Sequence, residues 1–151
     1  MTAVLLPDAP VSVASDLLGP IEVPAAACYD FPDGLPGFEG ARRFALVPAG
    51  REGLFWLQSL DAGALVFLLA DPFRCAAAYE VELSPADREA LGAAGPDDVA
   101  VLAIVTLPRG DGDAPSVNLR APVLLATAAR RGRQVVRSDD RYGITEPLSL
   151  D

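Results

Sequence analysis

The chain is divided into nine short apolar or alternating runs by Pro, Gly and Asp, and this punctuation constrains its fold more than any other feature. Runs of this length bounded by turn-forming residues are typical of β-strands, and their number favours a barrel or a sandwich. Residues 65–69 and 99–106 are apolar on both faces, which is typical of strands in the middle of a sheet. The runs are residues 19–23, 41–48, 54–60, 64–69, 78–83, 99–107, 116–119, 123–128 and 134–137.

A single helix interrupts these runs. Ser84-Pro85-Ala86-Asp87 combines an N-cap, a first-turn proline and a capping-box acid, and Gly92 or Gly95 ends the helix. We therefore expect an all-β, barrel-like domain of short antiparallel strands with one short α-helix at about residues 84–94. Residues 1–16 are expected to form a flexible N-terminal extension, which leaves residues 17–151 as one domain.

The segment from Asp30 to Phe44 is a closely specified loop. It contains two turn cassettes, Pro32-Asp33-Gly34 and Pro36-Gly37. In such turns proline presets a negative φ, and glycine adopts the positive φ that other residues avoid. A stiff loop that carries an aromatic residue and an acid is better suited to presenting a surface than to forming a reaction centre.

The composition weakens the case for an enzyme. The chain has no histidine, and all 12 of its basic residues are arginine, so the usual general base, zinc ligand and Schiff-base amine are missing. Cys28 and Cys75 are far apart in sequence and belong to no metal-binding motif, and both are typical of small core fillers. Neighbouring acids such as Asp97-Asp98 and Asp139-Asp140 lie in turn-like contexts, where solvated loop acids are far commoner than catalytic pairs. We expect no cofactor and no metal.

The charge indicates the kind of partner. A formal charge of −9 and a pI near 4.4 argue against direct nucleic-acid binding, and they favour either a basic protein partner or simple solubility. No apolar run is long enough to span a membrane, and the N-terminus lacks the pattern of an export signal, so a cytoplasmic location is expected.

Nine motifs in a fixed order resemble those of the bacterial flagellar assembly factor FliW family. The resemblance extends from about residue 17 to residue 148. The motifs are Gly19-Pro-Ile-Glu-Val23, Phe31-Pro-Asp-Gly-Leu-Pro-Gly-Phe-Glu39, Phe55-Trp-Leu-Gln-Ser-Leu60, Ala70-Asp-Pro-Phe73, Tyr79, Asp98-Val-Ala-Val-Leu-Ala-Ile-Val-Thr106, Val117-Asn-Leu-x-Ala-Pro-Val123, Arg131-Gly-Arg-Gln-Val135 and Tyr142. Arg120 and the run Cys75-Ala-Ala-Ala78 depart from the family's usual pattern, which bears on partner affinity and not on the fold.

The resemblance implies a small β-barrel without enzymatic activity. Proteins of this family bind the translational repressor CsrA, which relieves repression of flagellin mRNA translation, and they also bind flagellin in competition with the repressor. An acidic protein facing a basic RNA-binding dimer agrees with the charge of this chain.

Seven residues are candidates for contacting a partner, and all of them except Glu39 have a structural alternative. Phe38 could tie its loop to the barrel, Gln58 could pair inside the barrel, and Asp71 and Asn118 could hold their own turns. Trp56 could be an interface anchor but is expected in the core. The candidates are Phe38, Glu39, Gln58, Asp71, Asn118, Asp139 and Asp140.

Two other functions remain open from the sequence. The first is a small barrel that binds or transforms an anionic or sugar ligand through paired carboxylates, which requires a deep pocket lined by convergent acids. The second is a secretion chaperone that binds flagellin alone and never the repressor.

Overall fold

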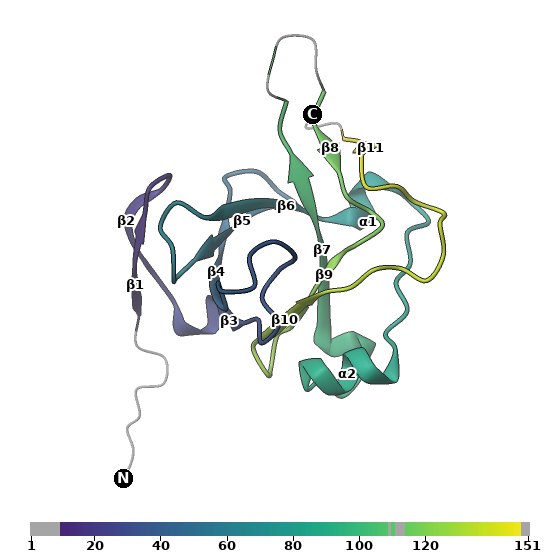
Figure 1. Cartoon of the computed structure of the whole chain (residues 1–151), viewed down its shortest axis with the longest axis horizontal. Helices are drawn as coiled ribbons and strands as arrows, with labels where there is room; N and C mark the ends of the chain where they lie inside the picture. Colours follow the sequence, from purple (N-terminus) through teal and green to yellow (C-terminus); the bar gives the residue numbers. More distant parts are fainter. Residues whose placement is uncertain (1–9, 109, 111–113, 149–151) are drawn as a thin grey trace.

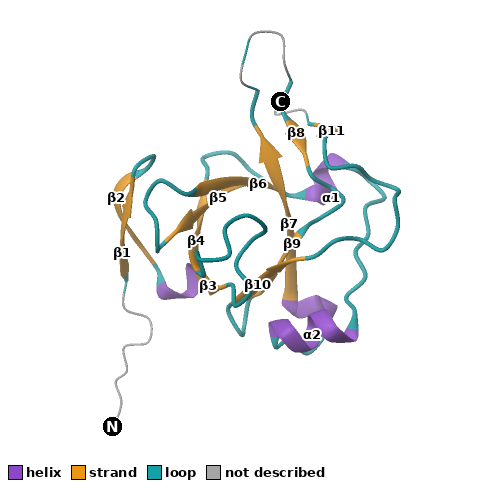
Figure 2. Ribbon diagram, in the orientation of Figure 1, coloured by secondary structure: helices purple, strands orange, loops and turns teal. Residues whose placement is uncertain are grey.

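The computed structural model describes residues 10–108, 110 and 114–148 (Figure 1). Strands account for most of the regular structure, and the helices are short (Figure 2). The strands are β1 (Val11–Ser15), β2 (Gly19–Val23), β3 (Cys28–Asp30), β4 (Arg43–Pro48), β5 (Leu54–Ser59), β6 (Val66–Ala70), β7 (Val99–Thr106), β8 (Ser116–Val117), β9 (Val123–Ala126), β10 (Arg131–Gln134) and β11 (Glu146–Pro147). The helices are α1 (Pro72–Cys75), α2 (Pro85–Leu91) and the 3₁₀ turns η1 (Ala25–Ala27) and η2 (Pro96–Asp98).

Seven of the strands close into a barrel. Their order is β7-β6-β5-β4-β3-β10-β9, and β9 pairs back onto β7 through residues 99–102 and 123–126. All of these pairings are antiparallel except β3 with β10, which meet in parallel at Asp30 and Arg131. β8 and β11 continue the sheet outward from the far end of β7. The expected all-β, barrel-like fold is confirmed.

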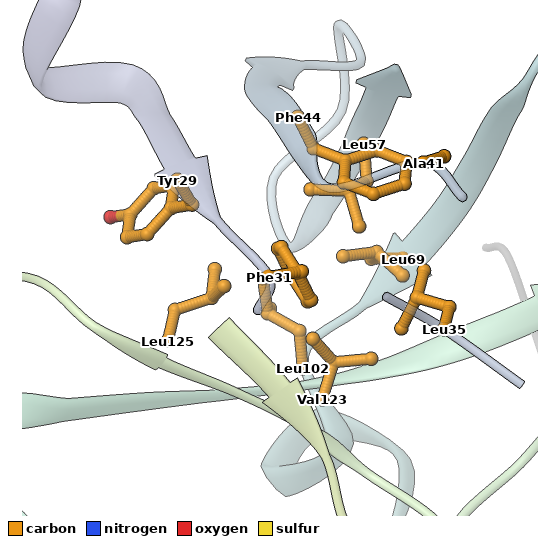
Figure 3. Packing of buried hydrophobic residues seen from close by; sticks show 10 residues of the cluster. All are labelled: Tyr29, Phe31, Leu35, Ala41, Phe44, Leu57, Leu69, Leu102, Val123 and Leu125. Carbon is orange, nitrogen blue, oxygen red and sulfur yellow. The ribbon is translucent and has the colours of Figure 1, made fainter. Parts of the chain in front are cut away.

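The barrel interior is filled by side chains. Phe31 is fully buried and lies at the centre of a ten-residue apolar cluster with contributions from both sides of the barrel (Figure 3). Its ring meets Phe44 edge to face at a centroid distance of 5.1 Å. Gly132 on β10 lies against the same ring, and a Cβ there would come within 2.5 Å of Cε1, so only glycine fits.

The β1–β2 hairpin lies beside the barrel as a separate two-stranded sheet (Figure 1). Val13 and Val23 pack against Cys28 and Ala45 of the barrel wall. Residues 11–15 were expected to belong to a flexible extension, and this expectation is wrong, because the alternating Val11-Ser-Val-Ala-Ser15 buries one face and forms β1. Residues 1–9, the rest of that expected extension, lie outside the described residues.

Two of the nine expected strands differ from the structure. Residues 78–83 form no strand: they keep an alternating burial pattern, but Tyr79 and Val81 pack on a neighbouring cluster without any ladder partner. The strand expected at 134–137 is β10, which begins three residues earlier at Arg131 and ends at Gln134. Both differences arise because alternation reports a half-buried surface and does not identify a pairing partner.

The expected helix is confirmed as α2. The Ser84 hydroxyl accepts a hydrogen bond from the backbone N–H of Asp87 at 3.0 Å, and Gly92 ends the helix with φ 70°. Leu91 is the buried anchor of this helix and packs on Leu124 and Ala126 of β9. The four-residue helix α1 was not expected from the sequence.

Candidate protein-docking surfaces

The loop between β3 and β4 crosses the front of the barrel in Figure 1 and presents Phe38. The ring of Phe38 packs edge to face on Phe67 at a centroid distance of 5.5 Å, yet 44% of the residue stays exposed. The loop is stiff because Phe38 N–H donates to the carbonyl of Leu35 at 2.7 Å and because Gly34, with φ 65°, leaves no room for a Cβ beside Glu39. Phe38 therefore ties the loop down and offers an aromatic surface at the same time.

Glu39 lies beside Phe38 as a fixed negative charge. Its carboxylate accepts a hydrogen bond from the backbone N–H of Gly37 at 3.0 Å. Hydrogen bonds from the N–H groups of Glu39 itself and of Gly37 lower the pKa of this carboxyl group, so it is ionised at neutral pH.

A second surface forms around Tyr79, between α1 and the chain that follows β10. Asp71 caps α1, its Oδ1 accepting from the N–H of Phe73 at 2.9 Å. Phe73 is 48% exposed, and its ring meets Tyr79 edge to face at a centroid distance of 5.8 Å. The ring of Tyr142 packs on Tyr79 in a tilted arrangement at a centroid distance of 5.0 Å. The Tyr79 hydroxyl donates to the carbonyl of Leu119 at 2.7 Å, which fixes the three rings.

Arg137 joins this aromatic group to the acids. Its guanidinium lies 5.0 Å from the Tyr79 ring centroid and 5.1 Å from that of Tyr142, and it donates to both oxygens of Asp139 at 3.2 and 3.0 Å. It also donates to the carbonyl of Glu80. The hydrogen bond from Arg137 is the main reason that the pKa of Asp139 is lowered, and the neighbouring Asp140 is exposed.

The structure brings four of the seven candidates close to Tyr79, namely Asp71, Asn118, Asp139 and Asp140. Phe38 and Glu39 lie together on a different loop, and Gln58 is buried. Asn118 Oδ1 accepts from the N–H groups of Arg120 and Ala121 at 3.1 and 3.0 Å, and this turn carries the carbonyl that receives the Tyr79 hydroxyl. We call the group of Asp71, Phe73, Tyr79, Asn118, Arg137, Asp139, Asp140 and Tyr142 the tyrosine face, and Phe38 with Glu39 the loop face. Among the described residues, no hydrogen bond, ion pair or ring contact links the two faces.

Gln58 requires a correction. It is fully buried, and it holds the β1–β2 hairpin on the barrel instead of facing a partner. Its Oε1 accepts from the Ser15 hydroxyl at 2.7 Å, while its Nε2 donates to the carbonyls of Ser59, Gly63 and Leu65. Trp56 lies two residues earlier on β5 and is partly buried against the apolar cluster that contains Tyr79, as expected for a core residue.

Phe73 and Arg137 belong to the tyrosine face but were not among the seven candidates from the sequence. Phe73 follows an Asp-Pro pair, which is a helix-start signal, so a one-turn helix with an exposed aromatic residue could have been inferred. No sequence pattern identifies the position of Arg137, because Tyr79 is far away in the sequence and Tyr142 lies outside any helix or strand.

The structure offers little support for chemistry on a ligand. A pocket of about 670 Å³ lies outside the barrel, and the acids that line it are already engaged: Glu52 pairs with Arg74 at 3.1 Å, and Asp71 caps α1. Within residues 10–108, 110 and 114–148, no group of three or more Cys, Asp or Glu side chains could hold a metal ion. No helix in the described part of the chain is long and apolar enough to cross a membrane.

These features define a small, closed β-barrel with a filled interior, which exposes two aromatic rings, Phe38 and Phe73, beside charged groups on its exterior. Comparison with known proteins identifies its relatives. The model of the family described as FliW protein matches residues 12–148, and the chain belongs to this family.

Individual relatives agree with that assignment. The flagellar assembly factor FliW of an Exiguobacterium species is 36% identical over 137 residues, which is 90% of this chain and 93% of the relative. The FliW of Syntrophotalea carbinolica is 40% identical over 119 residues, covering 78% and 84% of the two chains. A crystal structure of the flagellar assembly factor FliW superposes with a TM-score of 0.82 at 30% identity, covering 92% of this chain and 97% of the other.

Proposed function

We propose that this chain is a non-enzymatic flagellar assembly factor that binds a CsrA-type repressor and thereby relieves repression of flagellin mRNA translation. We propose flagellin as its second, chaperone-like partner, and the cytoplasm as the place where both are met. The observation that carries the proposal is membership of the FliW family over residues 12–148. The filled barrel supports it, because a protein without an internal ligand site has its exterior available for function.

The charge pattern supports a basic partner. The chain carries −9 overall, and the tyrosine face combines the exposed ring of Phe73 with Asp71, Asp139 and Asp140. An aromatic anchor surrounded by acids suits a partner surface that is basic at its rim and apolar at its centre. Among the described residues, Arg137 forms its ion pair with Asp139 and not with Asp140, so Asp140 remains available to a cation.

An RNA mobility shift tests the proposal. Purified protein is added to a CsrA-type repressor bound to a flagellin leader RNA, in moderate salt. We expect the RNA to be released at equimolar or higher protein, and RNA that stays bound under these conditions contradicts the proposal. Flagellin binding without repressor binding would identify a chaperone that acts on flagellin alone, and turnover of a metabolite that depends on a carboxylate would favour the enzyme.

Matched variants locate the contact. Phe73→Ala removes the exposed ring of the tyrosine face, and Phe38→Ala removes that of the loop face, so the variant that weakens release identifies the face used. Asp140→Asn is compared with Glu89→Gln, an equal charge change on exposed α2, away from both faces (Figure 1). Equal effects of these two changes would show that only net charge matters.

A further inference from the structure

Arg130 adopts a backbone conformation that side chains rarely accept. It ends the turn between β9 and β10 with φ 56°, and it is the one residue other than glycine with a positive φ among the described residues. Its N–H donates to the carbonyl of Ala126 at 2.7 Å, and its carbonyl accepts from the N–H of Asp30 at 2.9 Å. The turn thus directs the guanidinium towards η1, where Nη1 donates to the carbonyl of Ala25 at 2.8 Å.

Within the described part of the chain, no carboxylate lies at ion-pair distance from the Arg130 guanidinium. Three arginines are partly buried in the described part of the chain, and two of them have acids: Arg133 pairs with Asp33 and Asp87, and Arg137 pairs with Asp139. Arg130 has no carboxylate of a described residue within 4.0 Å. Cations withdrawn from water are normally paired, so this one is available to an anion.

A pocket of about 280 Å³ lies at this guanidinium, between η1, β3, β4 and the β9–β10 turn. Ala25 and Cys28 line it together with Asp30, Arg43 and Arg130. Asp30 pairs with Arg43 at 3.6 Å. Burial raises the pKa of the Cys28 thiol, an effect that Arg43 and Arg130 only partly offset, so the thiol stays neutral and supplies no negative charge. Two guanidinium groups against one carboxylate give the pocket a charge of +1 in a chain of −9.

We propose that this pocket binds a small oxyanion, a phosphate or a carboxylate group, between Arg130 and Arg43. The planar guanidinium donates parallel hydrogen bonds that match both groups. The site lies on β3 and the β9–β10 turn, and its test is independent of any protein partner.

The test is an NMR titration of the ¹⁵N-labelled chain with inorganic phosphate and, separately, with N-acetylalanine, whose carboxylate stands for a peptide end. N-acetylalanine amide and chloride at equal ionic strength are the controls for size and for screening. We expect saturable shifts of the Arg130 Nε–Hε group and of the Ala25 and Cys28 amides with an oxyanion only. The anion that saturates at the lower concentration identifies the source.

Three variants test the role of the guanidinium groups. Arg130→Gln is expected to weaken binding by about tenfold or more, the usual effect of losing a charge-assisted hydrogen bond. Arg43→Gln leaves the β9–β10 turn intact and is expected to weaken binding as well, which keeps the test valid if Arg130→Gln disturbs the fold. Arg42→Gln changes an exposed arginine that does not line the pocket and should leave binding unchanged. Shifts that never saturate, or that persist in both Arg130→Gln and Arg43→Gln, overturn the proposal.

Discussion

Gly132→Ala is expected to destabilise the barrel from the middle of its core. A Cβ at this position would lie 2.5 Å from Cε1 and 2.7 Å from Cε2 of Phe31. Carbon atoms in contact normally lie about 3.5–4.0 Å apart, so the ring would have to move by about 1 Å or more. Phe31 is fully buried among Leu102, Leu125 and other core residues, and this movement has no free space to use (Figure 3).

The magnitude follows from the cost of overpacking. Inserting a methyl group into a filled core costs about 1–3 kcal/mol, and the short contacts place Gly132→Ala at about 3 kcal/mol. For a chain of this length that loss lowers Tm by about 6–12 °C. Phe31→Leu alone should cost about 1–2 kcal/mol through lost packing.

A double-mutant cycle by urea denaturation measures the contact. In the Phe31→Leu background the added methyl group has room, so the combined loss should fall short of the sum by about 1–2 kcal/mol. Gly40→Ala is the matched control, because nothing lies within 4 Å of its added Cβ, and it should change stability by no more than about 0.5 kcal/mol. Additive losses, or a Gly132→Ala variant as stable as the parent, would show that the contact with Phe31 does not explain why position 132 is glycine.

Further predictions concern the polar groups. Gln58→Leu removes the acceptor of the Ser15 hydroxyl and one of the two donors to each of the carbonyls of Gly63 and Leu65, which keep the N–H groups of Asp16 and Ser59. We therefore expect a loss of about 2 kcal/mol and faster amide exchange at Asp16. Gln134→Leu, which breaks a single hydrogen bond to the carbonyl of Ala121, should cost about 1 kcal/mol, and equal losses would refute the role of Gln58. Because its pKa is lowered in the folded state, ionised Asp139 contributes stability above its unfolded pKa, and this contribution disappears as the pH falls through the folded pKa. The difference in unfolding free energy between Asp139→Asn and the parent, measured by urea denaturation, should therefore be full at about pH 7 and shrink as the pH falls below about 4. A constant difference would mean that the ion pair with Arg137 is not responsible. Asp71→Ala removes the N-cap of α1, and we expect it to lower the free energy of unfolding by about 1 kcal/mol. It should also weaken the Phe73–Tyr79 ring contact, which would reduce the near-ultraviolet circular dichroism signal. An unchanged signal would show that the Asp71 cap does not hold these two rings together.

Local features could be predicted from the sequence because their causes are local. The Ser84 cap and the Gly92 end of α2 depend on residues within one turn of each other, and so do the turns that hold Phe38. Gln58 shows the limit of this reasoning: alternation placed it on one face of β5, but its burial depends on Ser15, which is 43 residues away in the chain. The exposed ring of Phe73 and the position of Arg137 likewise depend on Tyr79 and Tyr142, which no periodic pattern connects.

The parallel pairing of β3 with β10 has a consequence for synthesis. Asp30 leaves the ribosome about 100 residues before Arg131, its partner in the pairing. Until then β3 to β6 can associate only as an open, curved sheet, with Phe31 and its neighbours exposed to solvent and to chaperones. A nascent chain halted before residue 131 should therefore be sensitive to proteases throughout, and resistance should arise in one step once β10 has emerged.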